Sequence, residues 1–191
     1  MGLQVMSARK ILPELPGLGD KLANGGAILE IGCGAGNHLL QLAKAFPNAR
    51  ITGVDIDTDS LKVARAKLAK AGVENRVSVF EGDISLATQA GKFDAVVMIE
   101  VLHEIAPAIR VPIINASANA LAPDGYLVII DETYPTTLTE MRQKEFLFPV
   151  QTGFEELMWG NVIPTREEQE NLLRGAGLSG AINRSIIGEG F

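Results

Sequence analysis

The sequence predicts an α/β protein built on a doubly wound, mainly parallel sheet with helices on both faces. Three observations support this fold class. A short apolar segment, 27–31, runs into a glycine-rich turn and then into a helix, 37–46. Apolar segments and helical segments then alternate as far as residue 130, which is typical of parallel sheets. Segment 93–99 is almost wholly apolar, as expected for a strand covered on both faces.

Each element has its own local signal. Residues 5–24 are interrupted by prolines and predict short helical pieces on the sheet edge. Helix 58–71 repeats small and apolar residues on one face and is followed by Gly72. Thr165 and Glu168 form a capping-box pattern that predicts another helix start. The expected strands are 27–31, 50–55, 76–81, 93–99, 126–130 and a sixth at 181–187, and a helix is expected at 109–121.

Composition limits the classes of function. A length of 191 residues suits a single domain, 1–191. The net charge of −6 and the lack of a basic cluster argue against a nucleic-acid partner. The sequence shows no signal peptide and no apolar run of about 18 residues, so no membrane partner is expected. Cys33 is the single cysteine, which fits a reducing compartment and a cytoplasmic location.

The glycine turn indicates a ligand site. Gly32, Gly34 and Gly36 allow positive φ angles and remove side chains that would keep a ligand from the backbone. The dinucleotide fingerprint would need glycine at Asn37. Asp55 follows Gly36 by 19 residues, where an acid can accept both hydroxyls of a ribose. The pattern favours an adenosine-containing ligand without a pyrophosphate, and a tight turn without a ligand is the alternative.

Five motifs in this order resemble the class I, Rossmann-like S-adenosylmethionine-dependent methyltransferases, in particular the catalytic domain of small-molecule O-methyltransferases. The motifs are Glu30–Gly36, Gly53–Asp55, Glu81–Ile84, Phe93–Val97 and Leu121–Gly125.

The resemblance implies S-adenosylmethionine as cofactor and S-adenosylhomocysteine as its product. It implies that the glycine turn receives the methionine part, with Glu30 below it, and that Asp55 holds the ribose. Asp83 would accept from the adenine amino group and Ile84 would donate from its backbone, although Asp83 could simply cap a helix. The implied cofactor-binding residues are Glu30, Gly32, Gly34, Gly36, Asp55, Ile56, Asp83, Ile84 and Glu100.

The chain departs from the family pattern at both ends. The family sheet normally ends in a β-hairpin, and here residues 188–191 resemble the turn into a last strand that is missing. Related O-methyltransferases carry an N-terminal dimerisation domain, and this chain begins where that domain would finish. An excised catalytic domain, a homodimer through the additional domain, and a chain that lost its ends are therefore all open.

The positions of one histidine and one acid indicate a group that could remove the proton of a hydroxyl acceptor. His103 follows the expected strand 93–99, where the resembling enzymes place a catalytic histidine, and Asp131 stands where they place its orienting acid. The resemblance thus implies His103 and Asp131 as catalytic residues. Class I members that do not use a histidine here as base are the alternative. His38 is expected to be structural, and two scattered histidines with one cysteine do not indicate a metal site.

The predicted function is transfer of a methyl group from S-adenosylmethionine to a small-molecule acceptor, with a hydroxyl oxygen as the expected atom. The apolar segment Met141–Trp159 is either a lid over that acceptor or a core or dimer surface. A non-catalytic regulatory domain that binds the cofactor or its product is the main alternative. Asn37 and Asp83 count against a nicotinamide-dependent oxidoreductase.

Overall fold

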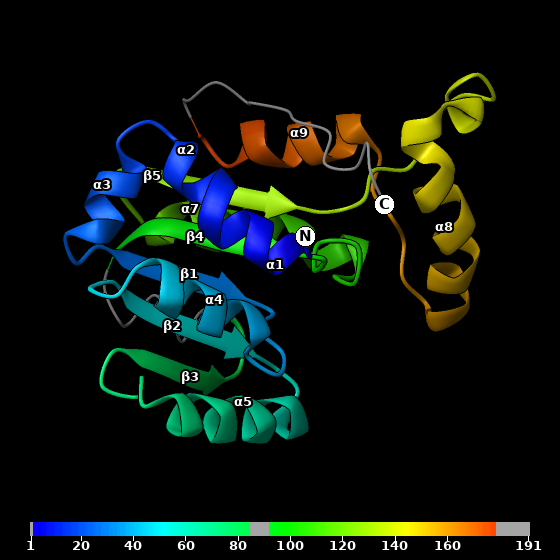
Figure 1. The fold of residues 1–191 in the computed structure, drawn as a ribbon. Coiled ribbons are helices and arrows are strands. Elements are labelled where there is room, and N and C mark those ends of the chain that lie inside the picture. The colour runs from blue at the N-terminus through cyan, green and yellow to red at the C-terminus, as the bar shows by residue number, and fades with distance from the viewer. Residues whose placement is uncertain (1, 85–91, 179–191) are drawn as a thin grey trace. The chain divides into compact units, whose positions relative to one another are not determined.

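Five parallel strands form one sheet in the order β3-β2-β1-β4-β5, which confirms the predicted fold class (Figure 1). The structure is a computed structural model and describes residues 2–84 and 92–178. The order runs outward from β1 in both directions, so the topological switch point lies between β1 and β4. The strands are β1 (Ala27–Ile31), β2 (Arg50–Asp55), β3 (Val77–Glu81), β4 (Phe93–Ile99) and β5 (Leu121–Ile130).

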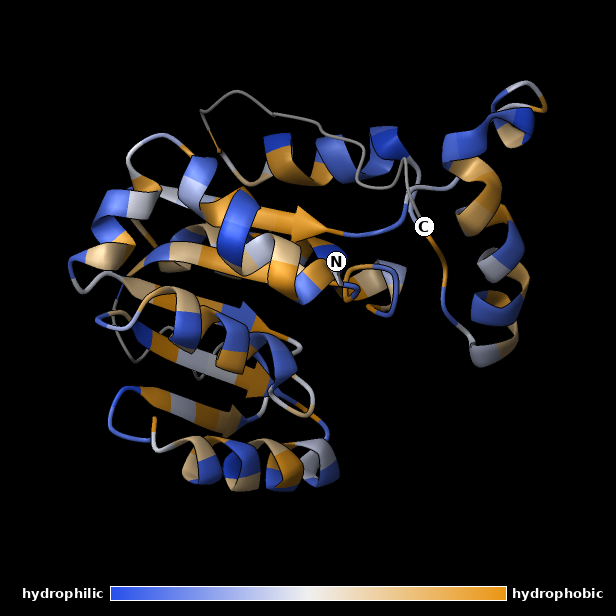
Figure 2. Cartoon of the chain, viewed as in Figure 1, coloured by the Kyte–Doolittle hydropathy of each residue, from blue (hydrophilic) through white to orange (hydrophobic). Residues whose placement is uncertain are grey.

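The core follows the two central strands. All five residues of β1 are buried, and six of the seven in β4 are buried. Figure 2 shows β4 in mainly hydrophobic colours. Ile28, Leu29 and Met98 are fully enclosed, and burial of each such side chain contributes roughly 1.5–3 kcal/mol. Glu30 is the exception in β1, because it is a carboxylic acid only 3% exposed.

Helices α4 and α5 begin and end close to where the sequence predicts. Helix α4 (Asn37–Ala45) begins after Gly36, whose φ is 74°. A Cβ on Gly36 would lie 3.0 Å from the Cβ of Ala64 in α5 (Thr58–Ala71), so glycine also allows the two helices to approach. The Asp57 carboxylate caps α5 by accepting from the N–H of Asp59, and Gly72 ends it at a φ of 66°.

The N-terminal helical pieces reach the sheet edge, as predicted, and also pack further in. The hydroxyl of Tyr126 in the edge strand β5 donates to the Pro16 carbonyl oxygen at 3.0 Å, and the pieces also contact α4 and β4. Apolar side chains on both sides of Pro13 explain this, because Leu12, Leu18 and Leu22 are fully buried. The pieces are α1 (Leu3–Met6), a π-helical stretch η1 (Ser7–Ile11), α2 (Leu12–Glu14) and α3 (Leu18–Ala23).

Strand β5 begins five residues earlier than predicted. Leu121 already pairs with Phe93, and the register then shifts so that Tyr126 pairs with Ala95. The predicted turn therefore lies within the strand as an irregularity. Asp124 has a φ of 58°, and a Cβ on Gly125 would lie 2.9 Å from the Ala122 carbonyl oxygen. Residues 122–125 therefore do form a turn, but the turn interrupts the strand instead of preceding it.

Residue contacts divide the chain into two units. The first contains Met1–Ile99 and Asn119–Ile130, and the second contains Glu100–Ala118 and the described residues from Asp131 onward. Most of the second unit is helical: α7 (Pro107–Ala120), the 3₁₀ turns η3 (Glu140–Arg142) and η4 (Lys144–Phe146), α8 (Leu147–Trp159) and α9 (Arg166–Gly175). The predicted capping box of α9 is present, since Thr165 and Glu168 each accept from the other's backbone N–H.

The expected strand 181–187 and the turn 188–191 lie outside the described residues. A single methyltransferase domain over 1–191 stays a prediction. Within the described ranges, no helix combines the length and hydropathy that a bilayer-spanning segment requires.

Candidate active site

The glycine turn lies at the carboxyl end of β1 and has the predicted backbone geometry. Gly32, Gly34 and Gly36 have φ angles of 70°, 47° and 74°. No heavy atom lies within 4 Å of the position that a Cβ on Gly34 would take, so the backbone is open there. A hollow of about 190 Å³ runs along the turn, and its lining residues are Gln4, Glu30, Gly32, Cys33, Gly34, Ala35, Asn37, His38 and Ile99.

Glu30 supplies a buried acceptor to this hollow. Its Oε2 has no hydrogen-bond partner among the described residues, and Nδ1 of His38 lies 3.2 Å from its Oε1. Burial raises the pKa of Glu30, and the charge of His38 opposes that rise. A ligand that brings a cationic donor would satisfy the open oxygen.

Asp55 holds the turn from the end of β2. Its Oδ2 accepts from the N–H of Gly34 at 2.6 Å, and its Oδ1 accepts from the N–H of Asp57 at 2.8 Å. Each carboxylate oxygen has two lone pairs, so one on each remains for a ligand hydroxyl. The next residue, Ile56, is 81% exposed and adds an apolar surface beside the carboxylate.

The third predicted acid is linked to Asp55 through the backbone. The N–H of Gly82 donates to the Asp55 carbonyl oxygen at 2.9 Å, and Asp83 follows Gly82 with an exposed side chain. Ile84 is buried. Glu30 and Asp55 come from the carboxyl ends of paired strands, since Ile31 pairs with Val54, and the charge of Asp55 therefore adds to the rise in the pKa of Glu30.

The carboxylate acceptors and the apolar surface at these strand ends fit the S-adenosylmethionine that the motifs imply. That molecule carries an ammonium group, a ribose diol and an adenine ring, and it has no phosphate. The chain offers an unpartnered buried carboxylate oxygen on Glu30, spare lone pairs on Asp55 and the exposed side chain of Ile56. Open backbone at Gly34 leaves room for close approach.

Cys33 is not a candidate nucleophile, although it lies inside the turn. It is 5% exposed. Burial, with the charges of Glu30 and Asp55, raises the pKa of its thiol to about 12. The thiol therefore stays protonated at neutral pH and acts as a small buried side chain.

In the second unit, the structure brings His103 and Asp131 together. Nδ1 of His103 lies 2.6 Å from Oδ1 of Asp131. The backbone N–H groups of Leu102 and His103 donate to Oδ2, and that of Glu132 donates to Oδ1. The side chain of Asp131 is fully enclosed, so it is fixed by four contacts and fixes the imidazole in turn.

Carboxylates around the imidazole set its charge. Burial alone would lower the pKa of His103, but the hydrogen bond and charge of Asp131, with Glu156 and Glu104, raise it to about 9. Glu100 follows Ile99 directly in the chain and has a φ of 58°. Burial and the charges of Asp131 and Glu132 raise the pKa of Glu100 to about 7.

Arg110 braces the loop that carries His103. Its guanidinium is buried and donates to the carbonyl oxygens of Ile105, at 2.8 Å, and of His103, at 3.4 Å. It also donates to the Val162 carbonyl oxygen.

The apolar segment Met141–Trp159 is mostly not core. Phe154, Met158 and Trp159 are each at least 70% exposed, and Figure 2 shows hydrophobic colour along α8. Phe146 is buried. Core packing therefore does not explain the segment, while a lid or an interface stays a prediction.

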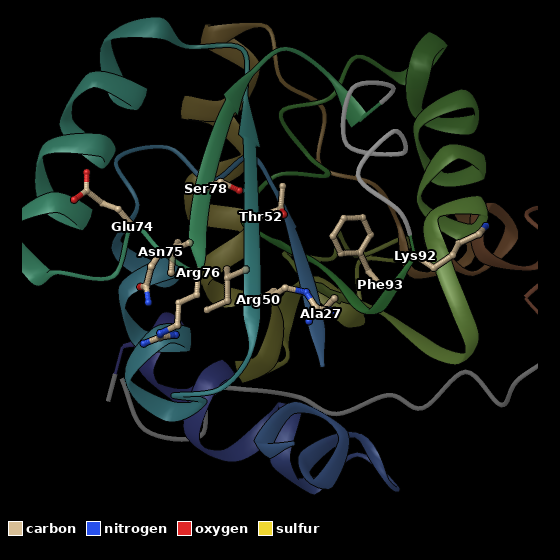
Figure 3. Close-up of a pocket in the computed structure, with 11 residues that line it drawn as sticks. Ala27, Arg50, Thr52, Glu74, Asn75, Arg76, Ser78, Lys92 and Phe93 are labelled. Atoms are coloured by element: carbon tan, nitrogen blue, oxygen red, sulfur yellow. The ribbon is translucent and has the colours of Figure 1, made fainter. Parts of the chain in front are cut away.

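A larger hollow, about 260 Å³, opens at the amino ends of the strands (Figure 3). Ala27, Arg50, Val77 and Phe93 lie at those ends. Two of its basic side chains are engaged: Arg76 donates to the Ala43 and Phe46 carbonyl oxygens, and Lys92 donates to the Asn119 carbonyl oxygen. Ligands of parallel sheets bind at the carboxyl ends, so this hollow is not the candidate site.

Sequence reasoning missed three residues. Gln4 lines the glycine-turn hollow, and nothing in its local pattern indicates this. Arg110 is a cation among apolar helix residues, and this contrast could have marked it as a residue with a specific role. Glu156 stands next to His103, and it is one of two acids in 154–159, whose other four residues are apolar.

The comparisons with known proteins agree with the geometry. The methyltransferase domain family matches residues 28–125, just over half of the chain. Polyketide synthase ThaQ of Burkholderia thailandensis is 32% identical over 104 residues, which are 54% of this chain and 5% of that protein. Ubiquinone biosynthesis O-methyltransferase of Xanthomonas axonopodis pv. citri is 35% identical over 105 residues, 55% of this chain and 42% of that enzyme. The chain thus spans less than half the length of these curated relatives.

Solved structures show the same fold. An O-methyltransferase family protein from Burkholderia thailandensis has a TM-score of 0.71 at 18% identity, covering 88% of this chain and 49% of that one. PKMT2 from Rickettsia typhi, solved with AdoHcy, has a TM-score of 0.52 at 26% identity, covering 65% of this chain and 23% of that one. The family match, with which the parallel sheet and the acceptor groups at its carboxyl edge agree, shows that the chain belongs to the methyltransferase domain family.

Proposed function

We propose that the chain methylates a hydroxyl oxygen on a small-molecule acceptor, with His103 and Asp131 at the acceptor. The observation that carries this proposal is the 2.6 Å contact between Nδ1 of His103 and Asp131. That contact leaves Nε2 without a hydrogen-bond partner among the described residues, so it is available to an acceptor hydroxyl.

In this proposal the first unit supplies most of the residues that bind the methyl donor. The backbone at Gly32, Gly34 and Gly36 receives its methionine part, Glu30 accepts from its ammonium group, and Asp55 accepts from its ribose. Ile56, Asp83 and Ile84 are assigned to the adenine, and Glu100 completes the predicted cofactor-binding set. S-adenosylmethionine supplies the methyl group and a thioether leaving group, and the chain supplies alignment and proton handling.

A small-molecule acceptor is supported over a nucleic acid by the net charge of −6. The names of two relatives, a polyketide synthase and a ubiquinone biosynthesis O-methyltransferase, also support a small-molecule acceptor. Methyl transfer to oxygen usually needs a group that removes the hydroxyl proton, worth about 10²–10⁴ in rate. A homodimer through a further N-terminal domain stays a prediction.

The test combines binding and turnover. Titration calorimetry with S-adenosylmethionine measures binding, and mass spectrometry then scores methylation of matched phenols, alcohols, thiols and amines. We expect binding, methylation of a hydroxyl acceptor, and at least a 100-fold loss of kcat in His103→Ala and Asp131→Ala, but not in the surface variant Lys62→Gln. Binding without turnover of any acceptor would favour the regulatory alternative, and turnover of amines alone would overturn the oxygen assignment.

A further inference from the structure

The methionine part of the methyl donor carries an ammonium group and a carboxylate, and the hollow along the glycine turn has separate groups for each. Glu30, assigned above to the ammonium group, has a buried Oε2 without a hydrogen-bond partner among the described residues. We propose that the side-chain amides of Gln4 and Asn37 bind the carboxylate, so that the N-terminal helix α1 completes the cofactor site. This role rests on the donor site proposed above and is independent of the acceptor atom.

The backbone of the glycine turn has few donors left for a carboxylate. Four of the five N–H groups in 32–36 already donate within the protein, and they are those of Gly32, Cys33, Gly34 and Gly36. Their acceptors are two backbone carbonyl oxygens and the Asp55 carboxylate. Each N–H group carries one hydrogen, so these four are engaged. The turn therefore offers close approach to the methionine part, and the side chains around it offer most of the free donors.

Gln4 brings one of these free donors to the hollow from outside the sheet. It lies in α1, which contacts α4, and its side chain lines the hollow. Gln4 is half-buried, and its side-chain amide makes no hydrogen bond among the described residues. The NH₂ group of a glutamine carries two hydrogens, and a carboxylate can accept from either. A ligand carboxylate in the hollow would therefore give this amide its partner.

Lys67 determines which half of the Asn37 amide is left for a ligand. Nζ of Lys67, in α5, donates to Oδ1 of Asn37 at 2.7 Å. An ammonium group has donors only, so the amide atom that it contacts is the oxygen, and the NH₂ half is free. Asn37 also lines the hollow, where this half can donate to a carboxylate. Lys67 is thus a positioning residue, and its positive charge lies on the same side of the ligand.

The start of α4 adds a favourable field for the same anion. Asn37 is the first residue of α4, and Gly36 before it provides no side-chain cap. The first N–H groups of a helix have no acceptor within the helix, and the helix dipole places partial positive charge there. The carboxylate would thus meet donors and positive charge, while the ammonium group would meet the open oxygen of Glu30. A donor that lacks the carboxylate would leave Gln4 and Asn37 without a ligand contact.

The experiment compares two ligands, S-adenosylmethionine and decarboxylated S-adenosylmethionine, by titration calorimetry without an acceptor. We expect the wild type to bind S-adenosylmethionine about 10–100-fold more tightly, because hydrogen bonds to a charged group are strong. Gln4→Ala and Asn37→Ala should each weaken S-adenosylmethionine binding by about 10-fold and leave the affinity for the decarboxylated ligand within about twofold. Lys67→Met should show the same pattern with a smaller loss, because Lys67 acts through Asn37.

A charge change at Gln4 gives a second readout. Gln4→Glu keeps the shape of the side chain but places a negative charge where the amide donor stood. It should weaken S-adenosylmethionine binding more than Gln4→Ala does, and it should not weaken binding of the decarboxylated ligand. Opposite responses of the two ligands to one substitution separate recognition of the carboxylate from a general loss of structure.

Gln41→Ala is the matched control, because Gln41 is an amide on α4 that is not among the residues lining the hollow. It should leave both affinities within twofold of the wild type, and circular dichroism confirms that the variants fold. Equal losses for the two ligands in Gln4→Ala and Asn37→Ala, or unchanged S-adenosylmethionine affinity in both, would overturn the proposal. Failure to methylate any hydroxyl would instead overturn the proposed function, and it would leave these binding results unaffected.

Discussion

The N–H of Gly34 donates to Oδ2 of Asp55 over 2.6 Å, so the acid proposed for the ribose also supports the glycine turn. The contact joins the loop after β1 to the end of β2. Structure and proposed ligand recognition therefore depend on the same carboxylate.

Replacing Asp55 with Asn should weaken both the support of the glycine turn and the binding of the methyl donor. The amide keeps one acceptor oxygen but loses the charge, and its NH₂ group cannot accept from a backbone N–H. We expect S-adenosylmethionine affinity to fall roughly 10–100-fold and the free energy of unfolding to fall by about 1–3 kcal/mol. Calorimetry and urea unfolding measure the two effects. The control is Asp59→Asn, whose side chain lies on the exposed face of α5. Unchanged affinity in Asp55→Asn would remove this acid from the site.

Cys33 should be unreactive in the folded protein. Its thiol is buried and its pKa is raised to about 12, so the thiolate fraction at pH 8 is about 10³-fold lower than for a free cysteine. We expect alkylation by iodoacetamide to be at least 100-fold slower in buffer than in denaturing urea, followed by mass spectrometry. Equal rates would show that the glycine turn opens readily. Because the chain has one cysteine, no other thiol complicates the measurement.

The His103–Asp131 contact should make stability depend on pH. The pKa of His103 is raised from 6.5 to about 9, so the folded state binds its proton more tightly than the unfolded state does. This stabilisation is fully present below pH 6.5 and is lost as pH rises through about 9. The free energy of unfolding of the wild type should therefore decline between pH 6.5 and 9, by on the order of 1–3 kcal/mol.

The matched variant for that measurement is His103→Gln, whose amide can still donate to Asp131 but does not titrate. Its unfolding free energy should be flatter over the same pH range. Glu100 has the same sign, because its raised pKa of about 7 means that stability is lost as it ionises. The two contributions are separated by Glu100→Gln, which should flatten the curve between about pH 4.5 and 7 and leave the decline from pH 6.5 to 9.

The part of the candidate site whose geometry the sequence predicted is the part that local chemistry dictates. Positive φ at Gly32, Gly34 and Gly36 follows from residue type, and Asp55 follows from its place at a strand end. The contact of His103 with Asp131 was expected from the resemblance, and it spans adjacent strand ends of a parallel sheet.

What sequence reasoning missed depends on tertiary packing. No local pattern shows that Glu156, 53 residues after His103, returns to its ring, or that Gln4 lines the glycine-turn hollow. The early start of β5 was missed for a related reason. A proline–aspartate–glycine turn normally precedes a strand, and here pairing of Leu121 with Phe93 begins before the turn.

Arg110 offers a test of how the His103 loop is held. It is 5% exposed and its acceptors are all backbone carbonyl groups, on Ile105, His103 and Val162. Replacement by Met keeps the length of the side chain but leaves three carbonyl oxygens without this donor. We expect the free energy of unfolding to fall by about 2–4 kcal/mol, as judged by circular dichroism in urea.

Arg110→Lys should recover part of the loss, since an ammonium can reach one or two carbonyls but cannot fork to three. S-adenosylmethionine affinity should stay within twofold of the wild type in both variants. Among the described residues, Arg110 donates to Ile105, His103 and Val162, and none of these is assigned to the cofactor. If Arg110→Met unfolds like the wild type, the guanidinium does not brace the loop and His103 is held by Asp131 alone.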